Sequence, residues 1–391
     1  MGVFLMSLSF KLMILLFNLY LGALDFTESS IGNLLSLHEW GAFLVALPAS
    51  LFMAKGNIRA SLIIASLCTA LGFGLLSSTS AQAVIGVSVL TIGSFTAIFR
   101  IAAGPFIMQN SNPEERPFAF SMNFALMVGA GFLGSLVGGF TRDFLAVSLQ
   151  NDVLAYRIAL FGFGGGFSTL SVIPFFLLRF EEHKGDFPIL QLLKGCNKPL
   201  FLRLLMPSML IGFGSGLTIP FINLYFKFEW GLSDSLIGTW FGLAQLTTFI
   251  GMMLSPLLVR RFHIVRVIVW SQLASIPFML IMGYVDLFPV VVGAFLLRQV
   301  LMNMHNPINT HFRMELVAPE EQSLINALRM IGFTGVRALA AFFGGRIIDH
   351  YSFSLSFTLT SVFYFIAAVL FFIFFHNVYI TSSAEDIQPP A

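Results

Sequence analysis

The stretch FNLYLGALDFTESSIG, residues 17–32, returns later in the chain as INLYFKFEWGLSDSLIG, residues 222–238. Asn18 and Tyr20 match Asn223 and Tyr225, and Gly32 matches Gly238. The two asparagines and the two tyrosines are 205 residues apart, and the two glycines are 206 apart. At the shift of 206 residues, NPEERPFAFSMNFAL (112–126) aligns with APEEQSLINALRMIG (318–332), and GGFTRD (138–143) aligns with GGRIID (344–349). Such self-similarity predicts that the chain is a duplicated structural unit.

The composition is that of an integral membrane protein. Of 391 residues, 57% are hydrophobic and only 10% are charged. Apolar runs of about 20 residues, the length needed to cross a bilayer as a helix, recur along the sequence. No Ala-x-Ala-like cleavage site follows the first run, so we expect a retained helix there. The twelve predicted spans are 3–22, 31–53, 61–78, 84–108, 118–140, 156–178, 201–224, 235–258, 265–285, 289–312, 323–347 and 354–375.

The spans divide into two six-helix bundles at RFEEHKGDFPILQLLKGCNK, residues 179–198, which is the only long polar connection. The predicted domains are therefore residues 1–178, a cytoplasmic linker 179–199, residues 200–376, and a cytoplasmic tail 377–391. Lys and Arg residues are concentrated on one side of the predicted spans, which orients both termini towards the cytoplasm of a plasma (inner) membrane. The positive residues assigned to this side are Lys55, Arg59, Arg116, Arg179, Lys184, Lys194, Lys198, Arg203, Arg260, Arg261, Arg266 and Arg313.

Three short motifs resemble the major facilitator superfamily. RIAAG, residues 100–104, is similar to the Arg-x-x-Gln-Gly motif of its fourth helix, with Ala103 in place of Gln. GSLVGG, residues 134–139, is similar to the Gly-Pro-x-x-Gly-Gly element of many exchangers, with Ser135 in place of Pro. MAKGNIRAS, residues 53–61, lies where Asp-Arg-x-Gly-Arg is common, with Ala54 at the Asp position. The resemblance implies an all-α fold of two pseudo-symmetric bundles and secondary transport of a small molecule by alternating access, and we expect a functional monomer.

Charged residues inside predicted spans indicate where a pathway runs, because a charge in a membrane core costs several kcal/mol without water or a partner. Six lie well inside: Lys11, Glu39, Arg100, Arg298, Arg329 and Arg337. The third, sixth, ninth and twelfth spans have none. In the resembled fold these four helices are peripheral and the other eight surround a cavity, so the charges predict a transport pathway.

Glu39 is the candidate coupling residue. At 100° per residue it shares a helix face with Gly32, Ser36 and Ala46, which predicts that it points inward, whereas neighbouring His38 is expected to pack. Burial favours the neutral acid and a nearby arginine favours the carboxylate, so protonation can follow changes in cavity access. Gln245 occupies the equivalent position in the second repeat, and uniport without a coupling ion stays open as an alternative.

Further candidate residues lie in the tenth and eleventh spans. Arg298, His305 and Asn309 fall on one stripe of a helix, and Pro307 predicts either a break that frees carbonyls for a ligand or a plain kink. Two interpretations of Arg329 are open, a cavity role and a side chain that reaches the cytoplasmic surface. The depth of Lys11 depends on where the chain begins.

The cavity charges favour an anionic substrate. Five cationic residues against one acid favour an organic anion or polar metabolite, and arginine binds carboxylate or phosphate through two parallel hydrogen bonds. The many Phe and Met side chains leave an exporter of lipophilic, drug-like compounds as the alternative. Whether transport is import or export is not determined by these residues.

Enzyme chemistry has little support. HEWGA, residues 38–42, lacks the second His of a zinc-hydrolase His-Glu-x-x-His motif, because Ala42 stands there. Cys68 and Cys196 give no metal or disulfide spacing. The sequence therefore predicts no metal, no cofactor and no nucleic-acid partner, and a membrane-embedded enzyme is a distant alternative. The expected partners are a small-molecule substrate, a proton or other coupling ion, and lipid.

Overall fold

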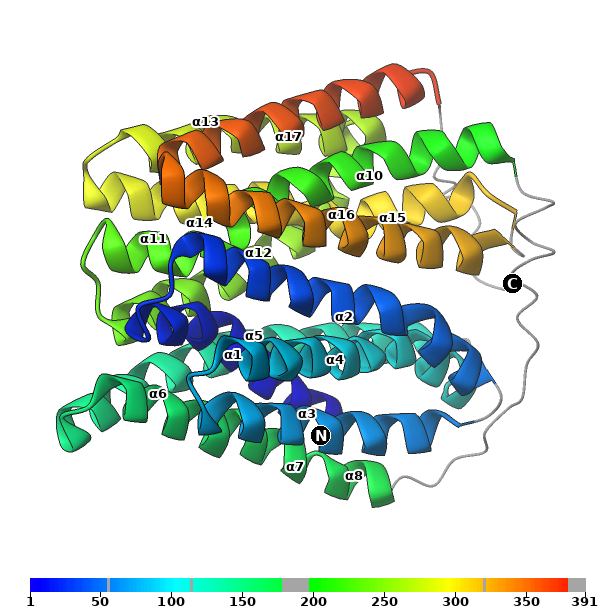
Figure 1. Cartoon of the computed structure of the whole chain (residues 1–391). Coiled ribbons are helices and arrows are strands. Elements are labelled where there is room, and N and C mark those ends of the chain that lie inside the picture. Colours follow the sequence, from blue (N-terminus) through cyan, green and yellow to red (C-terminus); the bar gives the residue numbers. More distant parts are fainter. Residues whose placement is uncertain (55–56, 113–114, 178–196, 319–320, 379–391) are drawn as a thin grey trace.

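The structure is a computed structural model that describes residues 1–54, 57–112, 115–177, 197–318 and 321–378. Within these residues, twelve helical spans are long and apolar enough to cross a membrane. Figure 1 shows them as two groups, α1–α8 and α10–α17, packed side by side with their helices roughly parallel. This arrangement confirms the predicted all-α fold of two six-helix bundles.

The two halves have matching element orders. The first comprises α1 (Gly2–Ala23), α2 (Glu28–Ala54), α3 (Ile58–Ser78), α4 (Gln82–Asn110), α5 (Arg116–Leu149), and a sixth span made of α6 (Asp152–Ala159), the π-helix η1 (Leu160–Gly165), α7 (Gly166–Leu170) and α8 (Val172–Leu177). The second comprises a span made of α10 (Lys198–Thr218), the 3₁₀-helix η2 (Ile219–Phe221) and α11 (Ile222–Phe228), then α12 (Asp234–Arg261), α13 (Ile264–Tyr284), a broken span of α14 (Phe288–Met304) and α15 (Asn306–Glu315), α16 (Gln322–His350) and α17 (Phe353–Phe375).

Local sequence signals explain where helices begin and break. The side chain of Asn197 accepts a hydrogen bond from the Leu200 amide at 3.3 Å, so α10 begins at Lys198, inside the predicted linker 179–199. The tenth span is interrupted beside Pro307, where a break or a kink was expected: α14 ends at Met304, and α15 starts at Asn306 with the proline in its first turn. Residues 179–196 and 379–391 of the predicted linker and tail lie outside the described residues.

The third, sixth, ninth and twelfth spans lie at the periphery, as the resembled fold implies. The main contacts between the halves join α2 to α16, α5 to α12, and α1 to α11 and α12. Span α3 packs on α4 and on the sixth span, while α13 and α17 pack on each other and on α10 or α14. Of the helices that contact across the halves, α1, α2 and α16 carry four of the six predicted span charges, whereas α5, α11 and α12 carry none of the six.

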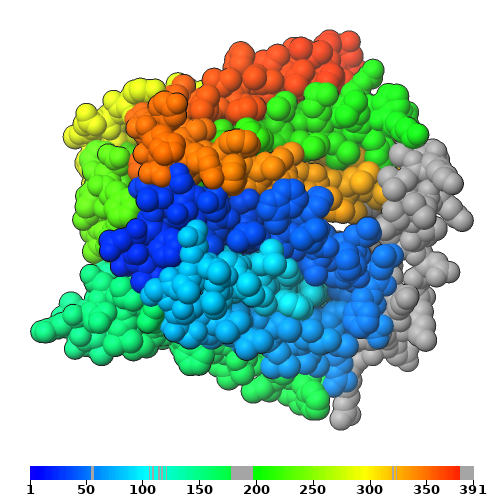
Figure 2. All heavy atoms as spheres, in the orientation of Figure 1, coloured from blue at the N-terminus to red at the C-terminus, as the bar shows by residue number. Residues whose placement is uncertain are grey.

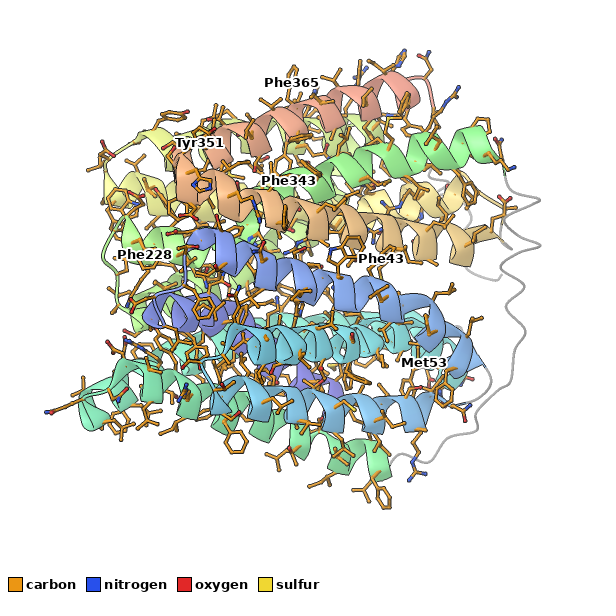
Figure 3. All side chains as sticks on the ribbon, in the orientation of Figure 1. Phe43, Met53, Phe228, Phe343, Tyr351 and Phe365 are labelled. Carbon is orange, nitrogen blue, oxygen red and sulfur yellow. The ribbon has the colours of Figure 1, made fainter. Side chains whose placement is uncertain are left out.

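The outer surface of the bundle is apolar. Phe343, Phe365 and Tyr351 are labelled in Figure 3, and their side chains are 47%, 54% and 74% exposed. Exposed phenylalanine and leucine side chains occur on most spans of both halves. Exposed apolar area on this scale is unfavourable in water and suits a lipid environment.

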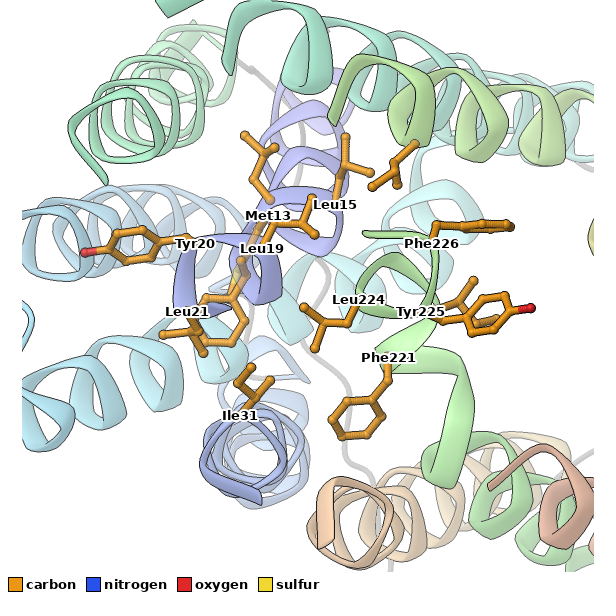
Figure 4. Packing of buried hydrophobic residues seen from close by; sticks show 14 of the residues in the cluster. Met13, Leu15, Leu19, Tyr20, Leu21, Ile31, Phe221, Leu224, Tyr225 and Phe226 are labelled. Carbon is orange, nitrogen blue, oxygen red and sulfur yellow. The ribbon is translucent and has the colours of Figure 1, made fainter. Parts of the chain in front are cut away.

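The repeated Asn-x-Tyr pair has matching roles in the two halves. Tyr20 donates to the Leu76 and Thr79 carbonyls at the end of α3, and Tyr225 donates to the Met282 carbonyl near the end of α13, at 2.5 Å. Figure 4 shows the two tyrosines pointing in opposite directions from α1 and α11, each into its own half. The repeat thus anchors the first helix of each half on the third.

Asn18 and Asn223 join the halves at their centre. The Asn18 amide donates to Asn223 Oδ1 at 3.1 Å and to the Pro220 carbonyl at 2.5 Å. The Asn223 amide donates to the Leu15 carbonyl at 2.8 Å. Both side chains are buried, so each bond replaces one that water would otherwise provide.

Replacement of Asn223 by leucine is expected to lower the free energy of unfolding by about 1–3 kcal/mol, because it leaves buried polar groups of α1 without partners. Thermal unfolding of the purified protein measures this effect. Asn303→Leu is the matched control, because Asn303 is only partly buried and bonds a carbonyl of its own helix. Equal losses for the two variants would contradict a special role of the central pair.

At one end of the bundle the two halves pack closely at glycine residues, and we call this the closed end. This closed end carries the turns at residues 24–27, 150–151, 229–233 and 351–352. A Cβ atom on Gly139 would strike the Asp234 carbonyl, and one on Gly345 would strike the Glu28 carbonyl. Because glycine has no Cβ atom, α5 can approach α12 and α16 can approach α2. Figure 2 shows a gap between the halves that widens towards the opposite end, where α2 ends and α16 begins.

Candidate functional site

A central cavity of about 320 Å³ lies between the two halves. It brings together five of the predicted site residues: Lys11 of α1, Glu39 of α2, Arg100 of α4, Gln245 of α12 and Arg337 of α16. Phe10, Phe17, Phe241 and Phe295 supply apolar wall. The cavity thus offers charged groups from both halves beside aromatic surface.

Glu39 and Arg337 form an ion pair across the two halves. Glu39 Oε1 lies 3.4 Å from Arg337 Nε, and the two side chains are 14% and 30% exposed. The packing of Gly32 on Ala341 and Gly345 brings this face of α2 onto α16. The predicted inward direction of Glu39 is therefore confirmed. His38 is buried and stacked on Phe10, as expected of a packing residue, but it also lines the central cavity, which was not expected.

Lys11 and Arg100 are the other two cationic residues among those that line the central cavity. Among the described residues, neither Lys11 nor Arg100 has a carboxylate within ion-pair distance. Gln245 lies against Gly131 of α5, where a Cβ atom would meet its side chain. Gln245, the uncharged repeat partner of Glu39, therefore lies at the contact between α5 and α12.

A second cavity of about 390 Å³ lies within the C-terminal half, and we call it the arginine pocket. Its lining includes Arg298, Arg313, Arg329 and Arg337, and none of its described lining residues is acidic. Arg337, Gln299 and Ile219 line both cavities. The two spaces are therefore adjacent, and Arg337 stands at their junction.

His305 is held on both sides. Its Nδ1 lies 3.0 Å from the Ser271 hydroxyl, and its Nε2 lies 3.1 Å from the Gln272 amide nitrogen. Both partners belong to α13, so the imidazole ties α13 to the break between α14 and α15. The imidazole ring lines the arginine pocket, but both of its nitrogens already have hydrogen-bond partners in α13. Arg298, on the same predicted stripe, donates to the Tyr364 hydroxyl at 2.8 Å.

The predicted end of the tenth span at residue 312, which leaves Arg313 in a connection, is wrong. The tenth span continues to Glu315, which leaves Arg313 inside α15 and only 3% exposed. The helix restarts at Asn306 after the break, so the stripe runs on through Asn309 to Arg313. The spacing of four residues between them was the signal for this position.

A buried charge cluster at the closed end was also not recognised from the sequence. Asp234 is fully buried and lies 3.2 Å from Arg142 Nε and 2.6 Å from Lys227 Nζ. The Tyr156 hydroxyl donates to it as well. These side chains come from the outer parts of α5, α6, α11 and α12, which no sequence spacing brings together.

Comparisons with known proteins agree with this geometry. The family model described as Major Facilitator Superfamily matches residues 1–194 and 204–390. A bacterial homolog of the human lysosomal transporter Spinster, in an inward-facing and occupied conformation, superposes with a TM-score of 0.77 at 15% identity, covering 95% of this chain and 94% of that one.

Two other solved structures are similar to nearly the same extent. The nucleoside transporter NupG gives a TM-score of 0.75 at 16% identity, over 95% of this chain and 96% of that one. A D-xylose-proton symporter gives 0.71 at 14% identity, over 95% of each chain. No curated protein sequence matches the chain. At these identities the structures establish the shared fold and leave substrate to be argued from the site.

Proposed function

Since the chain belongs to the major facilitator superfamily, we propose that this membrane transporter carries an organic anion and couples its movement to a proton through Glu39. The observation that carries the proposal is the Glu39–Arg337 pair, in which the one acid among the described residues that line the central cavity meets a cation shared with the arginine pocket. Both partners belong to helices that contact across the halves.

Charge supports an anionic substrate. Lys11, Arg100 and Arg337 line the central cavity against one carboxylate, and the adjacent pocket adds further arginines. A buried cation in a medium of low dielectric constant is stabilised when an anionic substrate binds beside it. A lipophilic cation would meet repulsion at the same position.

Competition for Arg337 supplies the coupling. An incoming anion pairs with Arg337 and removes the cation that stabilises the Glu39 carboxylate, so Glu39 binds a proton. By linkage, protonation of Glu39 frees Arg337 and strengthens anion binding by the same factor. Anion and proton then bind together, which makes the transporter a symporter.

The positive charges orient the protein. Lys198, Arg203, Arg260 and Arg261 lie at the end opposite the closed end, and the positive-inside rule assigns that end to the cytoplasm. The described conformation is then closed towards the outside and open towards the cytoplasm, with the N-terminus on the cytoplasmic side.

A thermal-shift screen of the purified protein tests the substrate class. Organic anions, neutral metabolites and lipophilic cations are added at several pH values, and the unfolding temperature is recorded. Anions are expected to raise the unfolding temperature. For a sulfonate, which stays charged at every pH tested, the coupling to Glu39 predicts a larger rise at lower pH. Stabilisation by lipophilic cations alone would overturn the proposal and favour an exporter of drug-like compounds.

Replacement of both Arg298 and Arg337 by glutamine is expected to reduce uptake of an organic anion at least tenfold, since each charge-assisted hydrogen bond contributes about 1.5–3 kcal/mol. Binding of a neutral compound that stabilises the wild type should change little. Radiolabelled uptake into proteoliposomes and thermal shifts measure the two effects. Equal losses for the anion and the neutral compound would indicate that the arginines only support the structure.

A further inference from the structure

Four arginines line the arginine pocket, and Glu39 pairs with only one of them, Arg337. Arg298 and Arg313 are 2% and 3% exposed, and Arg329 lines the same space. The Nε atoms of these three have no hydrogen-bond partner among the described residues. No described carboxylate lies within ion-pair distance of any of the three. Three guanidinium groups that share one cavity repel one another unless an anion joins them.

The partners that these arginines do have are neutral. Arg298 donates to the Tyr364 hydroxyl and, at 3.0 Å, to the Gln299 amide oxygen. Arg313 donates to the Thr310 hydroxyl at 3.0 Å. These bonds hold the side chains of Arg298 and Arg313 in place without neutralising their charges. A cluster of arginines without carboxylate partners is suited to bind a ligand group that has several anionic oxygens.

We propose that the transported anion is an organic phosphate monoester whose phosphate binds Arg298, Arg313 and Arg329, an inference that rests on the proposed function. A phosphate monoester carries up to two negative charges and three acceptor oxygens, and arginine forks match its geometry. Its organic part extends past Arg337 into the central cavity, where Phe10, Phe241 and Phe295 form the wall. The shared residues Arg337, Gln299 and Ile219 mark the junction.

Binding of phenyl phosphate, benzoate and benzenesulfonate to the purified full-length protein at pH 7.5 tests this inference. The three probes share one ring and differ in the charge and number of oxygens of the head group. Phenyl phosphate is expected to bind at least tenfold more tightly than the other two. Arg313→Gln should remove this preference, and Arg260→Gln, an exposed arginine at the end of α12, should preserve it.

The outcomes separate the two proposals. Equal affinity for all three anions, unchanged in Arg313→Gln, would overturn the phosphate inference and leave the anion transporter standing. Binding of none of the anions by a folded protein that binds neutral or cationic compounds would overturn both. An unfolding temperature for Arg313→Gln close to that of Arg260→Gln shows that lost affinity is not lost folding, and Arg313→Lys, which retains charge without the fork, should keep part of the preference.

A separate observation concerns the closed end. Asp143, in the last turns of α5, accepts a hydrogen bond from the Ser235 amide at the start of α12, at 2.8 Å. Asp349, near the end of α16, accepts one from the Ser29 amide at the start of α2, at 3.4 Å. Both members of the second pair follow from the first by the 206-residue shift of the repeat. In each pair, a carboxylate of one half caps a helix of the other half.

From this symmetry we infer that Asp143 and Asp349 are paired conformational contacts that stabilise closure of this end. A carboxylate at a helix N-terminus satisfies an unpaired amide and the helix dipole together. Both bonds cross between the halves, so they break when the halves separate at this end. Gly139 and Gly345 permit the approach, and the aspartates contribute the favourable energy.

Spin labels at Val147 and Tyr284, exposed residues in different halves at the closed end, report the separation by double electron–electron resonance. Asp143→Ala with Asp349→Ala is expected to raise the ratio of open to closed molecules by at least tenfold. Asp286→Ala, an exposed aspartate at the same end, is the control. An unchanged distance distribution in a folded double variant would overturn the inference.

Discussion

Replacement of Glu39 by glutamine is expected to abolish proton-driven accumulation of the substrate while leaving binding and exchange intact. Glutamine has the shape of the protonated acid and cannot release a proton, so Arg337 stays free for the anion at every pH. Anion affinity should therefore lose its pH dependence and remain at the wild-type value reached at low pH. In the wild type the affinity is expected to change about 5- to 150-fold across the titration, as a coupling of about 1–3 kcal/mol implies.

Proteoliposomes measure this result directly. With a pH gradient imposed, the wild type should accumulate a singly charged sulfonate, up to about tenfold per pH unit for an electroneutral one-to-one symport. Glu39→Gln should show no accumulation but should continue to exchange labelled for unlabelled anion. Glu28→Gln, on the same helix at the closed end, is the matched control. Full accumulation by Glu39→Gln would exclude Glu39 as the coupling residue.

Replacement of Asp234 by asparagine is expected to destabilise the protein by about 3–5 kcal/mol. The carboxylate is fully buried between Arg142 and Lys227, and its removal leaves a buried arginine with one less counter-charge. Because the cluster joins α5 and α6 of one half to α11 and α12 of the other, the variant should also weaken contact between the halves at the closed end.

Asp152→Asn provides the comparison. Asp152 pairs with the same arginine at 2.6 Å, but its side chain is 66% exposed. Exposed ion pairs contribute about 0–1 kcal/mol, because water replaces them at little cost. Unfolding of both variants by a denaturing detergent gives the difference. Equal destabilisation would mean that burial of Asp234 adds nothing to the strength of the cluster.

The proposals share one physical basis. The central cavity and the arginine pocket hold cations whose cost of burial is only partly offset by protein partners, so a ligand that offsets the rest is stabilised there. The closed end holds charges that are paired across the halves. One set of charges is thus available to substrate, and the other stabilises the conformation in which substrate reaches the site from the opposite end.

The amino-acid sequence alone determined the membrane class, the twelve spans, the duplication and the inward direction of Glu39. Apolar length, the repeat and a 100° helical period are local properties, so they can be read without knowing what packs against each helix. The stripe through Arg298 and Asn309 was visible for the same reason, although its continuation to Arg313 was missed because the predicted span stopped at 312.

Tertiary structure decided which charges meet. Arg337 lies almost three hundred residues from Glu39, and only the packing of α16 on α2 brings them to 3.4 Å. The burial of Asp234, the capping of α12 by Asp143 and the two hydrogen bonds of His305 likewise depend on neighbouring helices. Helix formation depends on residues three or four apart, whereas pairing of charges depends on how whole helices approach one another, and the glycines at their crossings set that approach.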